Sequence, residues 1–520
     1  MQSKNMKYNF RKLTMTVIIT PTKNTLADWR EIYWGAEFSL SPSANAGINS
    51  CAKAVQEIID RNEPVYGINT GFGKLASVRI NDEDLANLQR NLILSHSVGV
   101  GEYLPASIVR VVAAIKVASL CQGSSGARLE TIQLMIELMK ENLIPAIPAQ
   151  GSVGASGDLA PLAHFVAAMM GEGDFLVDGK AVPAEPLLRE RRLKPLVLAP
   201  KEGLALINGT QVSTALALAG LFEIERAFDA SLITGAMSLE GFKGTNVPFD
   251  PRIHALRPHQ GQTDVAKAML ALTENSEIRE KHQNKTRVQD PYSFRCIPQV
   301  LGSCLDAMRH AASILEIEAQ SVSDNPLIFA NGDVLSGGNF HAEPVGFAAD
   351  YLALAAAEIG SISERRTSLL LDPSISELPA FLTEKPGLNT GLMMGQITQA
   401  ALVSENKQKA TPAVVDTVPT SANQEDHVSM ATHGARRLLY MAENTQNIIA
   451  IELMTAAQAC DFHAPLKASP EIEKARLLLR EQVPHLDEDR RQGPEISAAR
   501  ELVRSGKLVA VLEEGRLPKI

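Results

Sequence analysis

Gly151-Ser-Val-Gly-Ala-Ser-Gly-Asp-Leu-Ala-Pro161 is the stretch from which the rest of this chain can be interpreted. Its closely spaced glycines open backbone conformations that other residues rarely adopt, so the chain can fold back sharply on itself. The amide nitrogen of Gly157, which carries no Cβ, could then attack the carbonyl carbon of Ala155. Loss of two waters, one of them from the Ser156 side chain, would leave a five-membered ring with an exocyclic methylidene. Because no ordinary side chain is an electrophile, such a ring favours covalent catalysis.

Other interpretations of this loop compete with the covalent one. A segment of glycine, serine and alanine is most often a flexible turn. A serine nucleophile elbow needs a glycine two residues after the serine, where Asp158 stands. A phosphate-binding loop needs lysine followed by serine or threonine after its glycines, and the sequence has none there. The plain turn therefore stays the main alternative until further motifs are considered.

Composition narrows the classes of protein. The chain has 520 residues, 45% of them hydrophobic, which suits roughly two to four domains or one elongated helical body. Its net charge of −9 and pI of about 5.8 offer no basic surface, so neither nucleic acid nor an anionic membrane is expected as a partner. Five scattered cysteines without a C-x-x-C pair predict neither a disulfide framework nor a zinc site, and they fit a cytoplasmic location.

Neither a signal peptide nor a membrane span is expected. The first 27 residues carry five basic side chains and no acidic one, and their apolar piece, residues 15–19, is too short for a signal-peptide core. We therefore predict a disordered extension over residues 1–27. The longest uncharged run, residues 203–222, contains Asn208 and Gln211, which predicts the start of a buried helix.

Helical periodicity dominates the chain. Asn81 is expected to cap a helix in which Leu85, Leu88 and Leu92 share one face that His96 continues. Pro105 is expected to begin a second helix, which Gly123 ends. Long segments rich in alanine and leucine predict a bundle of long helices, at about residues 210–239, 342–371, 391–409 and 431–462. Apolar faces of this length usually bury against other subunits.

These patterns predict four regions along the chain. The basic extension, residues 1–27, precedes an N-terminal domain, residues 28–208, which carries the glycine-rich loop. A central bundle of long helices follows over residues 209–464. A charged, helical segment, residues 465–520, is expected to lie at the periphery.

Five polar clusters lie between or at the ends of the predicted helices. They combine amide, acid–base and, in places, glycine residues, and they occupy residues 65–73, 207–211, 289–296, 336–341 and 423–427. One such cluster is explained by a capped loop, but five together indicate a functional site.

Taken together, these motifs resemble the methylidene-imidazolone (MIO) enzymes, which are the histidine, phenylalanine and tyrosine ammonia-lyases and the related aminomutases. The resemblance rests on the Ala155-Ser-Gly157 loop followed by Asp158-Leu-Ala-Pro-Leu-Ala-His164, and it runs from about residue 62 to residue 454. Ser95-His96 and the stretch from Thr420 to Met430 resemble the histidine ammonia-lyases (histidases) in particular. The segment from Trp29 to Cys51 is less typical of the family.

The resemblance implies an all-α fold of the fumarase/aspartase type, in which an N-terminal domain holds the MIO loop beside a bundle of long helices. It implies a homotetramer whose active sites are shared between subunits. The cofactor would be MIO itself, formed from Ala155, Ser156 and Gly157, with no external cofactor. No metal site is expected, because His341-x-Glu343 and Cys460-x-x-His463 lack further ligands at a suitable spacing.

The implied reaction is elimination of ammonia from L-histidine to give trans-urocanate. Tyr66 matches the base of the family, although a phenol needs a stabilised anion to act as a base near neutral pH. Glu425 would assist proton transfer and, with His96, would recognise the imidazole. A tyrosine or phenylalanine ammonia-lyase or aminomutase is the alternative, and a non-catalytic helical scaffold is a more remote one.

The remaining site residues are carried over from the same motifs. Arg295 would clamp the substrate carboxylate through two parallel hydrogen bonds, and Tyr292 would add another. Asn208 and Gln289 would position the MIO carbonyl and the amino acid, while Phe340 would pack near the electrophile.

Overall fold

The computed structural model describes residues 16–61, 65, 67, 70, 80, 84–281 and 288–520. Tyr66 and the expected helix cap Asn81 lie outside the described residues. Part of the predicted disordered extension is ordered, which corrects that expectation. Val17–Ile19 forms strand β1, whose alternating side chains at 17 and 19 are buried, and helix α1 begins at Leu26. The apolar residues Val17 and Ile19 therefore form a strand here, although the basic composition of the segment had suggested disorder.

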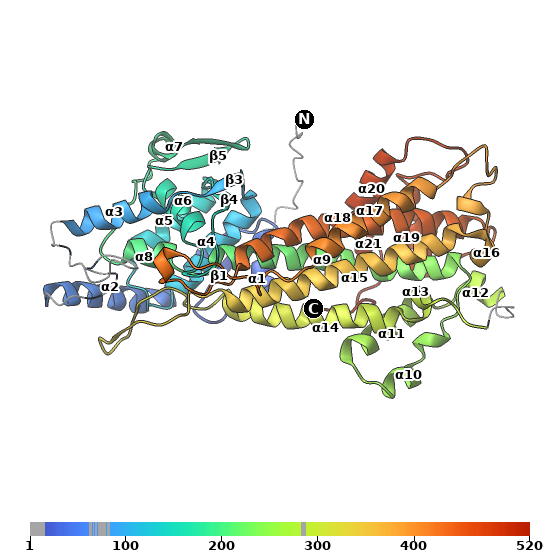
Figure 1. The fold of residues 1–520 in the computed structure, drawn as a ribbon, viewed down its shortest axis with the longest axis horizontal. Helices are drawn as coiled ribbons and strands as arrows, with labels where there is room; N and C mark the ends of the chain where they lie inside the picture. Colours follow the sequence, from blue (N-terminus) through green and yellow to red (C-terminus); the bar gives the residue numbers. More distant parts are fainter. Residues whose placement is uncertain are drawn as a thin grey trace. The chain divides into compact units, whose positions relative to one another are not determined.

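The fold is helical, and it divides into two compact units. Unit 1 comprises Met1–Ala219, Ala312–Ala349 and Pro412–Arg436, and unit 2 comprises Gly220–Ala311, Asp350–Thr411 and Arg437–Ile520. The long helices that contribute residues to both units are α9 (Gln211–Gly241), α14 (Ile297–Glu318), α15 (Glu343–Leu371) and α18 (Ala431–Asp461) (Figure 1).

Unit 1 contains the glycine-rich loop and most of the helices of the N-terminal part of the chain. Its helices are α1 (Leu26–Tyr33), α2 (Asn45–Asp60), α3 (Leu85–His96), α4 (Ala106–Leu120), α5 (Leu129–Lys140), α6 (Leu159–Met169), α7 (Ala184–Glu190) and α8 (Glu202–Ile207). Helix α4 packs against α1 and α5 and is buried over most of its length, while α6 contacts both α3 and α8.

The described strands form small two-stranded sheets, all of them in unit 1. The pairs are β1 with β2 (Phe38–Leu40), which are parallel, and three antiparallel pairs: β3 (Val100–Tyr103) with β4 (Pro148–Gln150), β5 (Asp174–Val177) with β6 (Lys180–Pro183), and β7 (Leu327–Ile328) with β8 (Val334–Leu335). In the β5–β6 hairpin, Asp178 and Gly179 both have positive φ, as a tight two-residue turn requires. The pair β3–β4 leads directly into the glycine-rich loop.

Unit 2 is a bundle of long helices with shorter helices at its margins. The shorter ones are α10 (Pro251–Ala255), α11 (Gln260–Leu272), α12 (Glu277–Lys281), α13 (Tyr292–Arg295), α16 (Pro373–Ser376), α17 (Met393–Lys409), α19 (Pro470–Arg480), α20 (Gly493–Arg504) and α21 (Lys507–Ala510). Helix α18 lies beside α17, where Gln399 Nε2 donates to the Ile448 carbonyl at 2.7 Å, and beside α15, where Thr445 Oγ1 donates to the Ala356 carbonyl at 3.2 Å (Figure 1).

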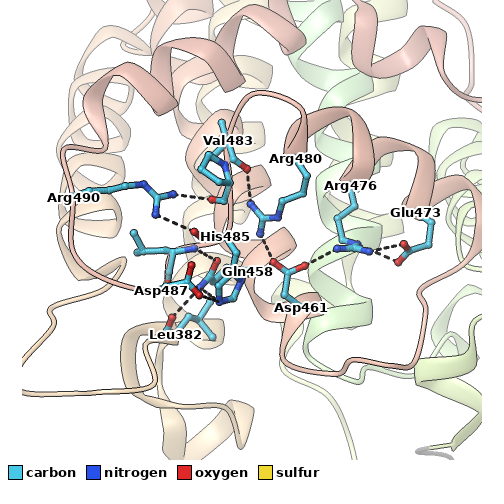
Figure 2. A network of polar contacts seen from close by, with 12 residues as sticks. Leu382, Gln458, Asp461, Glu473, Arg476, Arg480, Val483, His485, Asp487 and Arg490 are labelled. Atoms are coloured by element: carbon cyan, nitrogen blue, oxygen red, sulfur yellow. Dashed lines mark hydrogen bonds and ion pairs between the residues drawn. The ribbon is translucent and has the colours of Figure 1, made fainter.

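The C-terminal segment is tied to the end of α18 by a charged network. Figure 2 shows Asp461 accepting hydrogen bonds from Arg476 at 2.6 Å, Arg480 at 2.6 Å and His485 at 2.9 Å. These groups are only partly exposed, so the ion pairs are screened less than surface pairs are. The carboxylate therefore anchors three positions of the terminal segment to the bundle.

The predicted long helices are confirmed. Residues 210–239, 342–371, 391–409 and 431–462 correspond to α9, α15, α17 and α18, and Pro105 and Gly123 bracket α4 as expected. Helix α14, which has 22 residues, was not predicted. By length and composition one described helix, α15, could cross a membrane, but 72% of its most apolar window is buried, as in the core helix of a bundle.

Candidate active site

The glycine-rich loop lies between β4 and α6 and presses against a second glycine turn. Gly157 has φ +73°, and a Cβ placed there would come within 2.2 Å of the Gly209 carbonyl oxygen. The amide of Asp158 donates to that same oxygen at 2.7 Å. Only glycine can therefore occupy position 157 without displacing backbone.

The buried carboxylate of Asp158 holds the loop in place. It accepts hydrogen bonds from Ser152 Oγ at 2.8 Å, from the Ser213 amide at 2.7 Å and from Thr432 Oγ1 at 2.5 Å. These donors come from the loop itself, from the start of α9 and from the start of α18. The Asp158 carboxylate therefore holds the loop, α9 and α18 together strongly, because hydrogen bonds to charged groups are about twice as strong as hydrogen bonds between neutral groups.

Ser156 lines a cavity of about 790 Å³ in unit 1. Its Oγ donates to Oε1 of Glu425 at 2.5 Å, and its carbonyl oxygen accepts from Nδ2 of the buried Asn208 at 2.6 Å. The other carboxylate oxygen of Glu425 accepts from Thr420 Oγ1 at 2.5 Å. Both ends of the serine residue are thus fixed by polar partners.

A left-handed turn aims Glu425 at Ser156. Ser421, Ala422 and Asn423 have φ values of +50°, +52° and +65°, which is a strained conformation for residues other than glycine. The backbones of Thr420 and Glu425 close this turn with two hydrogen bonds, of 2.9 and 3.3 Å. Strain that is held by such closure is typical of functional sites.

His96 forms another part of the cavity wall. It ends α3, and its Nδ1 lies 2.8 Å from the Leu92 carbonyl oxygen. Because a carbonyl only accepts, the neutral ring carries its proton on Nδ1, so Nε2 is left with a lone pair. The predicted inward face is confirmed, since Leu85 and Leu92 are buried and both Leu92 and His96 line the cavity.

Lys116 is a buried cation that the sequence motifs above do not single out. Its Nζ donates to the carbonyl oxygens of Ala205 and Asn208, at 3.1 and 3.0 Å. Burial lowers the pKa of Lys116 to about 7. Its signal in the sequence is a charge with apolar residues on both sides in α4. In the structure it contacts the backbone of Asn208, the residue that donates to Ser156.

Comparisons with known proteins place the chain in a family. Residues 24–481 match the family model of the aromatic amino acid lyases. The chain belongs to the aromatic amino acid lyase family. Over 97% of its length it is similar to histidine ammonia-lyase from Trypanosoma cruzi, with 40% identity, a TM-score of 0.90 and coverage of 96% of that chain.

Other solved structures similar to this lyase carry different activities. Tyrosine aminomutase from Streptomyces globisporus shares 32% identity and a TM-score of 0.92, with 96% of this lyase and 98% of that chain covered. Phenylalanine aminomutase from Pantoea agglomerans shares 29% identity and a TM-score of 0.89, with 94% and 99% covered. The family and the helical fold are therefore shown, whereas the substrate depends on the residues of the cavity.

The predicted site residues of this lyase fall into two groups. Those that line the cavity are His96, Ala155, Ser156, Asn208, Phe340 and Glu425, with Gly157 directly beside them in the loop. Gln289, Tyr292 and Arg295 belong to unit 2 and are not among the lining residues. There the Arg295 guanidinium stacks at 4.5 Å from the ring centre of Tyr292, whose surface is 71% exposed.

The structure adds a third potential metal ligand to one pair that the sequence brings together. His341 and Glu343 were expected to lack a further ligand, yet His427 brings a ring nitrogen close enough for the ligand atoms of all three to lie within 4.8 Å of one another. The sequence could not show this, because His427 lies on a different loop, 86 residues from His341.

Proposed function

We propose that this lyase eliminates ammonia from L-histidine to give trans-urocanate, using an electrophile formed from Ala155, Ser156 and Gly157. The observation that carries the proposal is the grouping of His96, Glu425 and Ser156 on one cavity, with Glu425 hydrogen-bonded to Ser156. A histidine and a carboxylate there match the ring nitrogens of an imidazole, whereas a phenyl ring would leave them without partners.

The loop fits the proposed MIO ring. Gly157 has a positive φ and no Cβ, which leaves its amide nitrogen sterically accessible for attack on the Ala155 carbonyl. Asn208 donates to the carbonyl oxygen of Ser156, which would be conjugated with the methylidene. When formed, the ring supplies an electrophilic carbon for the substrate amine.

Other side chains of the cavity would activate the electrophile, transfer protons and bind the substrate. Asn208 would withdraw electron density through the Ser156 oxygen and so strengthen the electrophile. Glu425, fixed by Thr420, is placed to accept a proton from the imidazole or to pass one on. His96, with a lone pair on Nε2, could accept a hydrogen bond from a ring N–H of the substrate. Phe340, also on the cavity wall, would pack against the substrate beside the electrophile.

The assembly we propose is a homotetramer in the cytoplasm. Tyr292 and Gln289 are exposed in unit 2, so they and Arg295 could complete the cavity of a neighbouring subunit, where Arg295 would bind the substrate carboxylate. Exposed apolar residues such as Leu354 and Tyr440 on the long helices support burial between subunits. The five cysteines form no disulfide, which fits the reducing cytoplasm.

Tyr66 remains the residue that we propose as the base that removes the β-proton of the substrate.

A tyrosine or phenylalanine lyase or aminomutase is the second candidate, supported by the similarity to the two aminomutases. The decisive experiment incubates the purified full-length protein with L-histidine, L-tyrosine and L-phenylalanine and identifies the products. We expect urocanate and ammonia in equal amounts from histidine, and far slower turnover of the other two. A higher kcat/KM for tyrosine, or a β-amino acid product, would overturn the assignment.

Two substitutions test how the substrate is recognised. The double variant His96→Leu/Glu425→Gln should lower kcat/KM for histidine by about 10²-fold or more, the scale of losing a general acid–base group. It should also narrow the preference for histidine, because the pocket loses the His96 imidazole and the Glu425 charge that would pair with the substrate ring nitrogens. The measurement is the ratio of kcat/KM values for histidine, tyrosine and phenylalanine.

The matched control is Asp426→Asn, which removes an equal charge from the same loop and the same cavity wall without touching the Glu425–Ser156 hydrogen bond. Asp426→Asn should lower kcat/KM for histidine much less than the double variant does. An unchanged substrate ratio in the double variant would show that other residues recognise the ring.

A further inference from the structure

We propose that His341, Glu343 and His427 form a binding site for one divalent transition-metal ion of the zinc type, at the wall of the catalytic cavity. The ligand atoms of the three side chains lie within 4.8 Å of one another. His341 and His427 both line the cavity that contains Ser156. None of the three proposed ligands has a role in the elimination chemistry proposed above.

The tautomer of a neutral His341 ring is set by its backbone contact. Its Nε2 lies 3.2 Å from the carbonyl oxygen of His427, and a carbonyl only accepts, so Nε2 carries the proton. The other ring nitrogen, Nδ1, therefore presents a lone pair. An imidazole that donates one N–H to a carbonyl and turns its free nitrogen to a metal is the usual arrangement of a histidine ligand.

That lone pair faces a second electron-rich atom. Nδ1 of His341 is 3.7 Å from Oε2 of Glu343, which is buried and has no hydrogen-bond partner among the described residues. A gap of 3.7 Å is too long for a shared proton. It is close to the spacing of about 3.4 Å that two ligands of a tetrahedral zinc ion adopt when each bond is about 2.0–2.1 Å. A cation between the two atoms would remove their repulsion and satisfy the buried oxygen.

His427 supplies the third ligand and sets the chemical class of the ion. Its ring centre lies 5.8 Å from that of His341. Two imidazoles and one carboxylate favour zinc, cobalt or a similar ion, whereas calcium and magnesium prefer oxygen ligands alone. Three protein ligands leave a fourth position open, as in catalytic zinc sites, and a nitrogen or carboxylate oxygen of a molecule in the cavity could fill it.

The glycine-rich loop pre-organises the site. The carbonyl oxygen of Gly154 accepts from the amide of Ala342 at 3.2 Å and from Ser429 Oγ at 3.0 Å. The carbonyl of Val153 accepts from the amide of Met430 at 2.9 Å. Both segments that carry the ligands are therefore bound to the carbonyl oxygen of Gly154, which limits the movement needed to close around an ion.

The experiment titrates Co²⁺ into metal-stripped, full-length protein and follows its visible absorption, then displaces it with Zn²⁺. We expect one Co²⁺ per chain with the intense spectrum of four-coordinate cobalt. His341→Ala and His427→Ala should each weaken binding at least about tenfold, and Glu343→Gln should do the same while keeping the shape of the side chain. The matched control is His259→Ala, which removes an exposed histidine of unit 2 that does not line the cavity and should leave binding unchanged.

Circular dichroism of each variant checks that the helices are intact. Absence of a saturable cobalt spectrum, or equal binding by wild type and by the folded Glu343→Gln and His427→Ala proteins, would overturn the proposal. Because the spectrum is recorded without substrate, its outcome is separate from the urocanate assay. Failure of the metal site and failure of the proposed lyase reaction are therefore distinguishable.

Discussion

Ser156→Ala should give a folded protein that has lost nearly all lyase activity. Alanine has no hydroxyl to eliminate, so the methylidene carbon cannot form, and we expect a fall in kcat of about 10³-fold or more, as for the loss of covalent nucleophiles in other enzymes. The partner of the Ser156 side chain, Glu425, is part of the cavity wall and not of the helical core, so the helices should remain intact.

Intact mass spectrometry measures the cofactor apart from activity. The wild-type chain should be lighter than its encoded mass by two waters, and Ser156→Ala should lack the dehydration of residue 156. Ser152→Ala is the matched control, because it changes another serine of the same loop that supports Asp158 but keeps Ser156. An active wild-type enzyme whose intact mass equals its encoded mass would contradict the MIO proposal.

Glu452→Ala should produce the largest loss of stability, about 3–5 kcal/mol in the free energy of unfolding. The Glu452 carboxylate and the Arg366 guanidinium are both fully buried and paired in unit 2. The carboxylate also accepts from Thr234 Oγ1 at 2.8 Å, Ser238 Oγ at 2.8 Å and Ser363 Oγ at 2.6 Å. It thereby joins α9, α15 and α18, and its removal leaves a buried guanidinium unpaired and takes the carboxylate acceptor away from three hydroxyls.

Urea denaturation followed by circular dichroism compares the variants. The double variant Glu452→Leu/Arg366→Met should recover much of the loss, because an apolar pair does not need desolvated charges to be matched. The matched control is Glu443→Ala, which removes a carboxylate from an exposed ion pair on the same helix and should change stability by less than about 1 kcal/mol. If Glu452→Ala and Glu443→Ala unfold at the same urea concentration, the buried network contributes little to the free energy of unfolding.

Local features were predictable from the sequence. The periodicity of residues 431–462 anticipated α18 (Ala431–Asp461), because the apolar spacing that makes a helix is contained within the helix itself. The same spacing placed Leu92 and His96 on one inward face of α3. Helix α14 was missed, although its apolar residues also recur at helical spacing, and no sharp break in composition marks its start after α13.

The glycine-rich loop was the part of the proposed site that sequence alone could indicate, because Ala155, Ser156 and Gly157 are consecutive and the proposed ring closure needs only atoms of neighbouring residues. Tertiary structure decided which side chains meet that loop. Glu425 is 269 residues from Ser156 and Lys116 is 92 residues from Asn208, yet both pairs are joined by hydrogen bonds. His427 likewise joins His341 and Glu343 only in the folded chain. Such contacts depend on how helices and loops pack over long separations, which local residue preferences do not encode.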